Sequence, residues 1–171
     1  MLPTINWDKT CEEQLNKQIQ LEYWASYQYD LIWAYFNQSN VASENIANFF
    51  LKSANEERTH AHTLMDYQNK RGGAVVLTGI NPVDLSFIDQ KSSMLSCFTK
   101  ALEMEQVVYC SLKKLTEFAA LKNDHHFSDF ITNTFLDEQI KSLDEINRYI
   151  TQLKKIQDSP TGEWLFDKHF K

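Results

Sequence analysis

Apolar side chains recur at alternating steps of three and four residues along four long stretches of the chain. Such spacing is typical of amphipathic helices that pack in a bundle, because it places one apolar stripe on each helix. The stripes predict long helices over about 8–37, 43–71, 93–122 and 123–157, and a short fifth helix over about 161–170. We therefore expect an all-α protein, a four-helix bundle with a short C-terminal helix.

Residues that commonly start or end helices flank these stretches. Thr10 followed by Glu13 fits a capping box at the start of the first helix. The pair Gly72-Gly73 fits the end of the second helix, and Asn123-Asp124 fits the start of the fourth. These signals support the predicted helix boundaries.

The segment 73–92 has no helical period and contains Pro82. An extended chain of that length reaches about 66 Å, whereas a helix of roughly 29 residues spans about 44 Å. The segment can therefore run the length of the bundle and connect two parallel helices, while the short connections elsewhere make their helices antiparallel. We expect a bundle with one long crossover, forming a single domain over 1–171.

Each apolar stripe is interrupted near its middle by polar residues that can bind a metal ion. The interruptions are Glu22, Glu57 with His60, Glu105 and Gln139. In an aligned bundle they fall in one layer of the core. Glu57 and His60 stand one helical turn apart, so both can reach the same ion.

Three carboxylates in one core layer are costly, because each loses hydration and repels the others. No lysine or arginine stands beside them on the stripes. A divalent or trivalent cation would resolve the conflict, so the sequence predicts a dinuclear metal centre. Simpler interpretations exist for single members: a Glu-x-x-His pair is often only a solvated helix face, and Gln139 could be a hydrogen-bonded core residue.

The ligand types narrow the choice of metal. Carboxylate oxygens with one imidazole suit Fe, Mn or Zn, and no thiolate selects a softer ion. A symmetric di-iron bundle would carry a second Glu-x-x-His motif, but Lys141 and Ser142 stand where its histidine would be. The second ion should be held weakly, which suits a metal that passes through as a substrate. Tyr29, two turns after Glu22, is either a core tyrosine with a satisfied hydroxyl or part of the site.

Composition excludes several other classes of protein. The 171 residues include 17 Lys+Arg and 23 Asp+Glu, a net charge of −6, with only 4 Gly and 3 Pro. The acidity disfavours nucleic-acid binding, and the scarcity of turn-forming residues disfavours β-sandwich and doubly wound folds. No segment is apolar enough to span a membrane. Three widely spaced cysteines without a C-x-x-C pair, and an N-terminus without signal-peptide features, predict a cytoplasmic protein.

Five sequence blocks together resemble a eukaryotic ferritin subunit of the heavy, catalytic type. They are 21–27 (LEYWASY), 55–61 (NEERTHA), 68–73 (QNKRGG), 135–139 (FLDEQ) and 165–169 (LFDKH). The resemblance implies a ferritin-like bundle with a ferroxidase centre at the five polar interruptions. It also implies that two Fe(II) ions per subunit, as substrate, are oxidised by O₂ and stored as ferric oxyhydroxide. The resemblance further implies that the mineral is stored inside a cage of about 24 subunits, made of this chain alone or mixed with other ferritin subunits.

The chain departs from the resembled family at two surfaces that conduct or nucleate iron. The family's three-fold pores usually carry an aspartate and, three residues on, a glutamate, whereas this chain has Asp129 and Thr132. We expect a weaker ring of carboxylates there. Of the helix-two glutamates that favour mineral nucleation, Glu56 remains, while Thr59 and His62 occupy the neighbouring positions.

Two other functions fit parts of the sequence. A structural cage subunit without catalysis would lack the ferroxidase ligands, all of which are present here. A stand-alone di-iron oxidase, acting on an organic substrate or peroxide, would usually carry the second Glu-x-x-His motif. The molecular mass in solution and the absorbance change on adding Fe(II) in air separate these functions.

Overall fold

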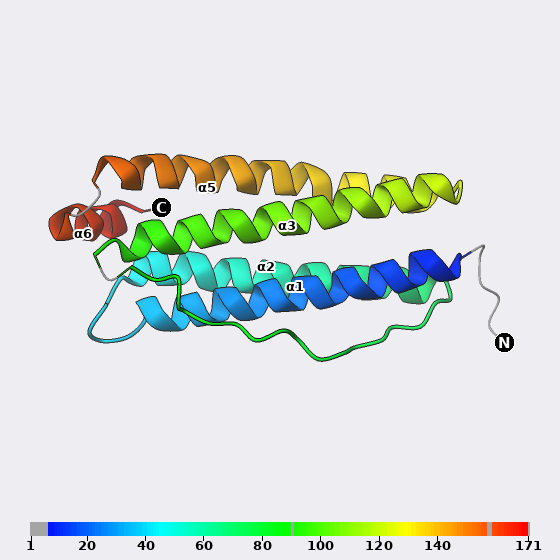
Figure 1. Cartoon of the computed structure of the whole chain (residues 1–171), viewed down its shortest axis with the longest axis horizontal. Coiled ribbons are helices and arrows are strands. Elements are labelled where there is room, and N and C mark those ends of the chain that lie inside the picture. Colours follow the sequence, from blue (N-terminus) through cyan, green and yellow to red (C-terminus); the bar gives the residue numbers. More distant parts are fainter. Residues whose placement is uncertain (1–6, 90, 157–158, 171) are drawn as a thin grey trace.

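Long helices lie side by side along the longest axis of the molecule (Figure 1). The computed structural model describes residues 7–89, 91–156 and 159–170. Its helices are α1 (Lys9–Phe36), α2 (Glu44–Lys70), α3 (Ser93–Leu121), α4 (His125–Ile131), α5 (Asp137–Lys155) and α6 (Pro160–His169), with a π-helical segment, η1 (Thr132–Leu136), between α4 and α5. The predicted all-α bundle with a short last helix is confirmed.

The expectation of one regular fourth helix over 123–157 is wrong in detail. The segments α4, η1 and α5 follow one another without a break, but η1 is a π-helix. A π turn holds more residues than an α turn, so it rotates the side chains that follow it relative to those before it. A constant helical period cannot show this change. The predicted end at Gln157 lies outside the described residues.

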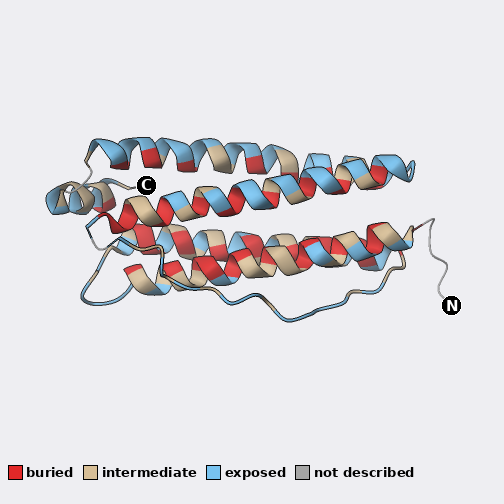
Figure 2. Cartoon of the chain, in the orientation of Figure 1, coloured by how far each residue is buried: buried red, intermediate tan, exposed pale blue. Residues whose placement is uncertain are grey.

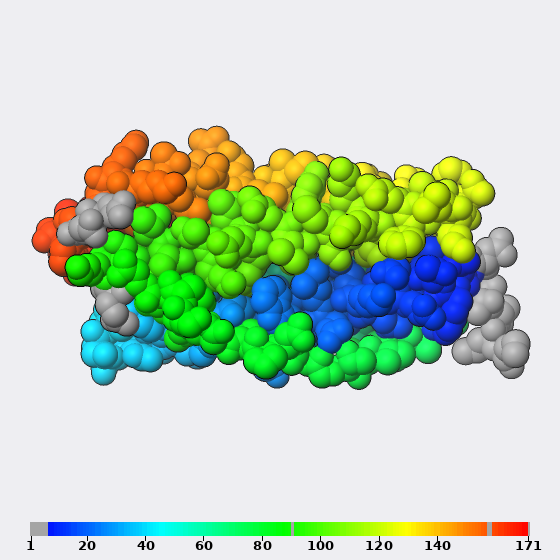
Figure 3. All heavy atoms as spheres, in the orientation of Figure 1, coloured from blue at the N-terminus to red at the C-terminus, as the bar shows by residue number. Residues whose placement is uncertain are grey.

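The crossover, described over residues 71–89, follows α1 from one end of the bundle to the other (Figure 1). In the space-filling view it lies on the surface beside α1 (Figure 3). Side-chain amides of α1 hold it at both ends: Nδ2 of Asn16 donates to the carbonyl of Ala74 at 3.0 Å, and Nε2 of Gln28 to that of Asp84 at 2.9 Å. As predicted, this connection makes α2 and α3 parallel.

The first helix begins differently from the prediction. Asp8, not Thr10, is its N-cap, and α1 starts at Lys9. Oδ1 of Asp8 accepts hydrogen bonds from the backbone N–H groups of Thr10 at 2.9 Å and Cys11 at 3.4 Å. The capping box from Thr10 to Glu13 is therefore wrong, because an aspartate two residues earlier already satisfies the first backbone donors.

Two other predicted helix ends are confirmed. Gly72 has a φ of 78°, the left-handed conformation that ends many helices and that a glycine adopts without strain. Asp124 caps α4, with Oδ1 accepting from the backbone N–H of Phe127 at 3.0 Å. These ends fix where α2 stops and where α4 begins.

Buried residues lie on the faces of the long helices that are turned toward one another, and exposed residues lie on the outer faces (Figure 2). The polar residues predicted to interrupt the apolar stripes are buried too: Glu22 is 0% exposed, Glu57 4%, Glu105 5% and Gln139 3%. Four polar side chains thus sit inside the bundle, as the sequence predicted. None of the helices in the described part of the chain is long and apolar enough to cross a membrane.

Candidate metal centre

Glu22 from α1 and the pair Glu57 and His60 from α2 converge in the core. One potential ligand atom of each lies within 4.8 Å of those of the other two. Oε2 of Glu57 is 3.6 Å from Nδ1 of His60, because the two residues stand one turn apart on the same helix face. The three side chains offer two carboxylates and one imidazole around a single point.

Two oxygens of this group have no hydrogen-bond donor. Oε2 of Glu22 and Oε2 of Glu57 are buried and accept no hydrogen bond from the described residues, since Nδ1 of His60, 3.6 Å from Oε2 of Glu57, is too far away to donate one. The other oxygen of Glu22 accepts from Nε2 of Gln18 at 2.7 Å. A buried carboxylate oxygen without a donor has lost its hydration and gained nothing in return. A cation bound between the two carboxylates would compensate for that loss.

Glu105 lies beside this group and is held by two neutral donors. The hydroxyl of Tyr29 donates to Oε1 of Glu105 at 2.5 Å, and Nε2 of Gln139 donates to Oε2 at 2.8 Å. Glu105 does not belong to the 4.8 Å group formed by the α1 and α2 residues. The structure therefore shows two adjoining halves, one with free oxygens and one with a carboxylate fixed by hydrogen bonds.

Burial raises the pKa of all three carboxyl groups. The pKa of Glu57 rises to about 8, first through burial and then through the negative charge of Glu105. The pKa of Glu105 rises to about 7 through burial, although the hydrogen bond from Tyr29 opposes the rise. Burial and the charge of Glu57 raise the pKa of Glu22 well above its usual value. A metal ion binding here must displace protons.

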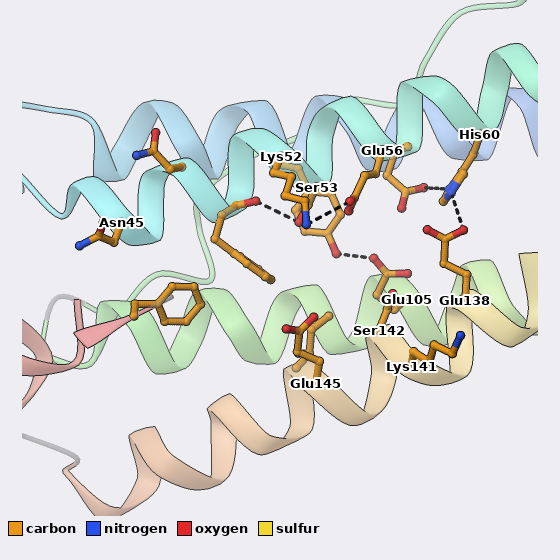
Figure 4. A pocket seen from close by; sticks show the side chains of 16 residues that line it. Asn45, Lys52, Ser53, Glu56, His60, Glu105, Glu138, Lys141, Ser142 and Glu145 are labelled. Atoms are coloured by element: carbon orange, nitrogen blue, oxygen red, sulfur yellow. Dashed lines mark hydrogen bonds and ion pairs between the residues drawn. The ribbon is translucent and has the colours of Figure 1, made fainter. Parts of the chain in front are cut away.

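A cleft of about 460 Å³ between α2 and α5 adjoins the buried groups. Its lining includes buried Glu57 and Glu105 and, further out, exposed Glu56, Glu138 and Glu145. In Figure 4 the side chains of His60 and Glu138 point toward each other, and Nε2 of His60 is 3.4 Å from Oε2 of Glu138. Five glutamates against two lysines, Lys52 and Lys141, make the lining of the cleft acidic overall.

The remaining predicted residues take different positions. Tyr29 is buried in the core, and its hydroxyl donates a hydrogen bond to Glu105, so it is a core tyrosine with a satisfied hydroxyl that also contacts a candidate ligand. Glu56 is exposed in the cleft and pairs with Lys52 at 3.5 Å. Asp129 is exposed on α4 and does not line the cleft, so a single chain assigns it no role at the buried site.

Sequence reasoning missed two residues of this region. Nε2 of Gln18 donates to Glu22 from one turn earlier on the same helix face. The four-residue spacing between the two is visible in the sequence and could have identified Gln18. Glu138 precedes the stripe residue Gln139 and is half exposed, so the apolar pattern marks it as solvent-facing. The Glu138 side chain is long enough for its carboxylate to reach His60 from the edge of α5.

Comparison with known proteins agrees with the fold and with the sequence motifs. The Ferritin-like domain family matches residues 12–156. The chain is 39% identical over 166 residues to the ferritin middle subunit of Aquarana catesbeiana, covering 96% of this chain and 93% of that protein. It is 41% identical over 164 residues to the chloroplastic ferritin of Malus baccata var. xiaojinensis, covering 95% of this chain and 65% of that protein. The chain belongs to the ferritin family of iron-storage proteins.

Proposed function

We propose that this ferritin oxidises Fe(II) with O₂ at the buried centre before the iron is stored. The observation that carries the proposal is the pair of unpartnered carboxylate oxygens on Glu22 and Glu57, grouped with His60 within 4.8 Å. Hard oxygen ligands with one imidazole suit iron in either oxidation state. Because burial raises the pKa values of Glu22 and Glu57, these carboxyl groups hold protons in the metal-free chain until a cation replaces them.

Each residue has a role in this proposal. Glu57 bridges the two iron ions, and Glu22 and His60 complete the tighter half-site. Glu105 holds the weaker ion, and Gln139 hydrogen-bonds to a bound water or oxygen species. Tyr29 orients the Glu105 carboxylate through its hydrogen bond of 2.5 Å. The neutral amide of Gln139 in place of a carboxylate, together with the missing second histidine, favours release of the second ion as product.

The reaction uses iron as its substrate, two ions per subunit and turnover, and needs no organic cofactor. Two Fe(II) ions supply two electrons to O₂, which yields peroxide and two Fe(III) ions. The negative carboxylates offset the positive charge that builds up on the metal, and protons leave the site as the ions bind. The acidic cleft with Glu56 and Glu138 gives the Fe(III) ions a way out.

Storage requires an enclosed space, so the proposal includes a hollow cage of about 24 copies with closed symmetry. Asp129, exposed on α4, would contribute the carboxylate of an iron-conducting pore in that cage. The cytoplasmic location indicated by three unpaired cysteines stays a prediction, because one relative of similar identity is chloroplastic.

The test combines molecular mass with oxidation kinetics. Purified protein is sized by gel filtration and then mixed with Fe(II) in air at several iron-to-subunit ratios. Absorbance at roughly 300–350 nm, where ferric–oxygen species at carboxylate sites absorb, should rise quickly up to about two Fe(II) per subunit and more slowly beyond. A cage that shows no fast phase would indicate a structural subunit without catalysis. Fast oxidation by a monomer would indicate a stand-alone oxidase.

A further inference from the structure

A series of aromatic rings leads away from the buried centre. It begins at Tyr29, whose ring stacks on Phe50 with centroids 6.0 Å apart. Phe50 contacts Phe98 at 5.1 Å, and Phe98 contacts Tyr149 on α5 at 5.3 Å. The first three rings are at most 1% exposed. These three rings are therefore shielded from bulk solvent, and only the outer ring, Tyr149, is partly exposed.

Both ends of the series pair a phenol with a carboxylate. Tyr29 donates to Glu105 at 2.5 Å, and Tyr149 donates to Glu145 at 2.8 Å. A phenol gives up an electron easily only when its proton can leave at the same time, and a hydrogen-bonded carboxylate can take that proton. Burial and the hydrogen bond to Glu145 raise the pKa of Tyr149 to about 12, so it keeps its proton at neutral pH until it is oxidised.

Glu145 also connects the outer end of the series to the iron path. It is exposed and lines the same cleft as Glu57, His60 and Glu105 (Figure 4). An Fe(II) ion in the cleft can therefore approach the outer tyrosine while the centre is occupied. The inner tyrosine lines the cleft itself, and the outer tyrosine is joined to the cleft through its hydrogen bond of 2.8 Å to Glu145.

We propose that Tyr149 is an electron relay that passes electrons from Fe(II) in the cleft, through Phe98 and Phe50, to Tyr29 and the buried centre. The inference rests on the proposed ferroxidase function. Two Fe(II) ions reduce O₂ only to peroxide, whereas reduction to water takes four electrons. The relay supplies the missing two electrons, one at a time, without a further ion entering the filled site.

Each transfer balances. Peroxide at the centre is the oxidant: it takes one electron from Tyr29, and the phenol proton moves to Glu105. Tyr149 then gives one electron to the Tyr29 phenoxyl radical, which recovers its proton from Glu105, while the proton of Tyr149 moves to Glu145. Fe(II) in the cleft reduces the Tyr149 radical, becomes Fe(III), and the proton returns from Glu145. Two such cycles supply two electrons. Together with two protons, released as water hydrolyses the Fe(III) formed in the cleft, they convert one H₂O₂ to two water molecules.

Tyr35 provides a matched comparison. Its ring contacts Phe36 at 5.1 Å, and Phe36 stacks on Phe50 at 5.8 Å, so Tyr35 also connects to the series. Within the described residues its hydroxyl has no carboxylate partner, unlike that of Tyr149. Tyr35→Phe therefore removes a phenol near the series that has no carboxylate to accept its proton.

The experiment compares Tyr149→Phe, Glu145→Gln, Tyr35→Phe and the unaltered chain, all assembled and iron-free at the start. Each is mixed with Fe(II) and O₂ at about four Fe(II) per subunit, two for the centre and two for the cleft. Freeze-quenched electron paramagnetic resonance follows phenoxyl radicals, and a peroxidase assay measures released H₂O₂. Phenylalanine keeps the ring packing of Tyr149, and circular dichroism checks the fold.

With a working relay, Tyr149→Phe lengthens the life of the Tyr29 radical and raises released H₂O₂ about twofold, and Glu145→Gln shifts both in the same direction. Tyr35→Phe leaves both unchanged. Equal radical lifetimes and H₂O₂ yields in Tyr149→Phe and the unaltered chain would overturn the relay. The fast oxidation of the first two Fe(II) ions, recorded in the same samples, reports separately on the ferroxidase function, since its absence in the unaltered chain would contradict that function instead.

Discussion

Gln139 donates a hydrogen bond of 2.8 Å from Nε2 to Oε2 of Glu105, across the gap between α5 and α3. The amide nitrogen thus faces the carboxylate, and a neutral side chain stands where a charged ligand would hold a second ion tightly. This relationship makes the two halves of the centre unequal. It is the structural reason to expect one tight and one weak iron.

Gln139→Glu should strengthen the weak half-site. A carboxylate there adds one negative charge and one potential ligand, so the second ion should bind about tenfold more tightly and leave more slowly. Titration calorimetry with Zn²⁺, which does not react with O₂, measures the two binding steps. Gln106→Glu, a change at an exposed position on α3, is the control and should leave both steps unchanged. A second step of unaltered affinity in Gln139→Glu would show that this residue does not face the ion.

The metal-free protein should lose stability as the pH rises. Glu57 has a pKa of about 8 in the folded chain against its usual 4.5, so between these values the folded chain holds a proton that the unfolded chain has lost. The free energy of unfolding therefore falls from about pH 5 to about pH 8. Glu57→Gln, which stays neutral, should flatten this dependence and gain about 1–3 kcal/mol over the unaltered chain near pH 8.

Thermal unfolding of metal-free samples at several pH values measures this effect. Glu117→Gln removes an exposed carboxylate from α3 and should keep the slope of the unaltered chain. A slope in Glu57→Gln as steep as in that control would mean that other groups cause the pH dependence.

Asp167 should stabilise the N-terminus of α2 from the last helix. It is 1% exposed, and its Oδ1 accepts hydrogen bonds from the backbone N–H groups of Asn45 and Ile46, each at 3.0 Å. Ser43, the N-cap residue of α2, makes no capping hydrogen bond with its own side chain. Asp167→Ala leaves one buried and one partly buried backbone donor unsatisfied and should cost about 1–3 kcal/mol.

Chemical denaturation of Asp167→Ala measures this cost. Asp144→Ala, which removes an exposed partner of Arg148, is the control and should change stability by less than about 0.5 kcal/mol. Equal stabilities for the two variants would mean that α6 docks through its apolar contacts alone.

Asp129→Ala should slow iron uptake into the assembled cage. A ring of carboxylates raises the local concentration of cations, so its loss should reduce the oxidation rate most at low ionic strength, by about threefold or more. Stopped-flow oxidation at two salt concentrations measures the effect, and Asp144→Ala serves as the control. The same rate in both variants would place iron uptake elsewhere on the shell.

The sequence predicts the bundle and most of the site because both rest on the helical period. The stripe interruptions locate Glu22, Glu57 and Glu105 in one layer, since any regular helix carries its core face straight along its length. The π-helical turn Thr132–Leu136 breaks that regularity, so its effect on α5 could not be predicted. Glu138 could not be found either, because a half-exposed carboxylate at the edge of a stripe is a normal surface residue.

The most direct test of the ferroxidase centre is the oxidation of Fe(II) by the variant Glu57→Ala/His60→Ala. Both side chains belong to the group around one point in the core, and one of the unpartnered oxygens is Oε2 of Glu57. The cage should still assemble, because removing a buried carboxylate relieves repulsion within the bundle. A control variant, Glu117→Ala/His62→Ala, removes the same residue types from exposed positions. We predict that the fast absorbance rise is lost in the first variant and kept in the control; a fast phase of unaltered rate in Glu57→Ala/His60→Ala would contradict the account.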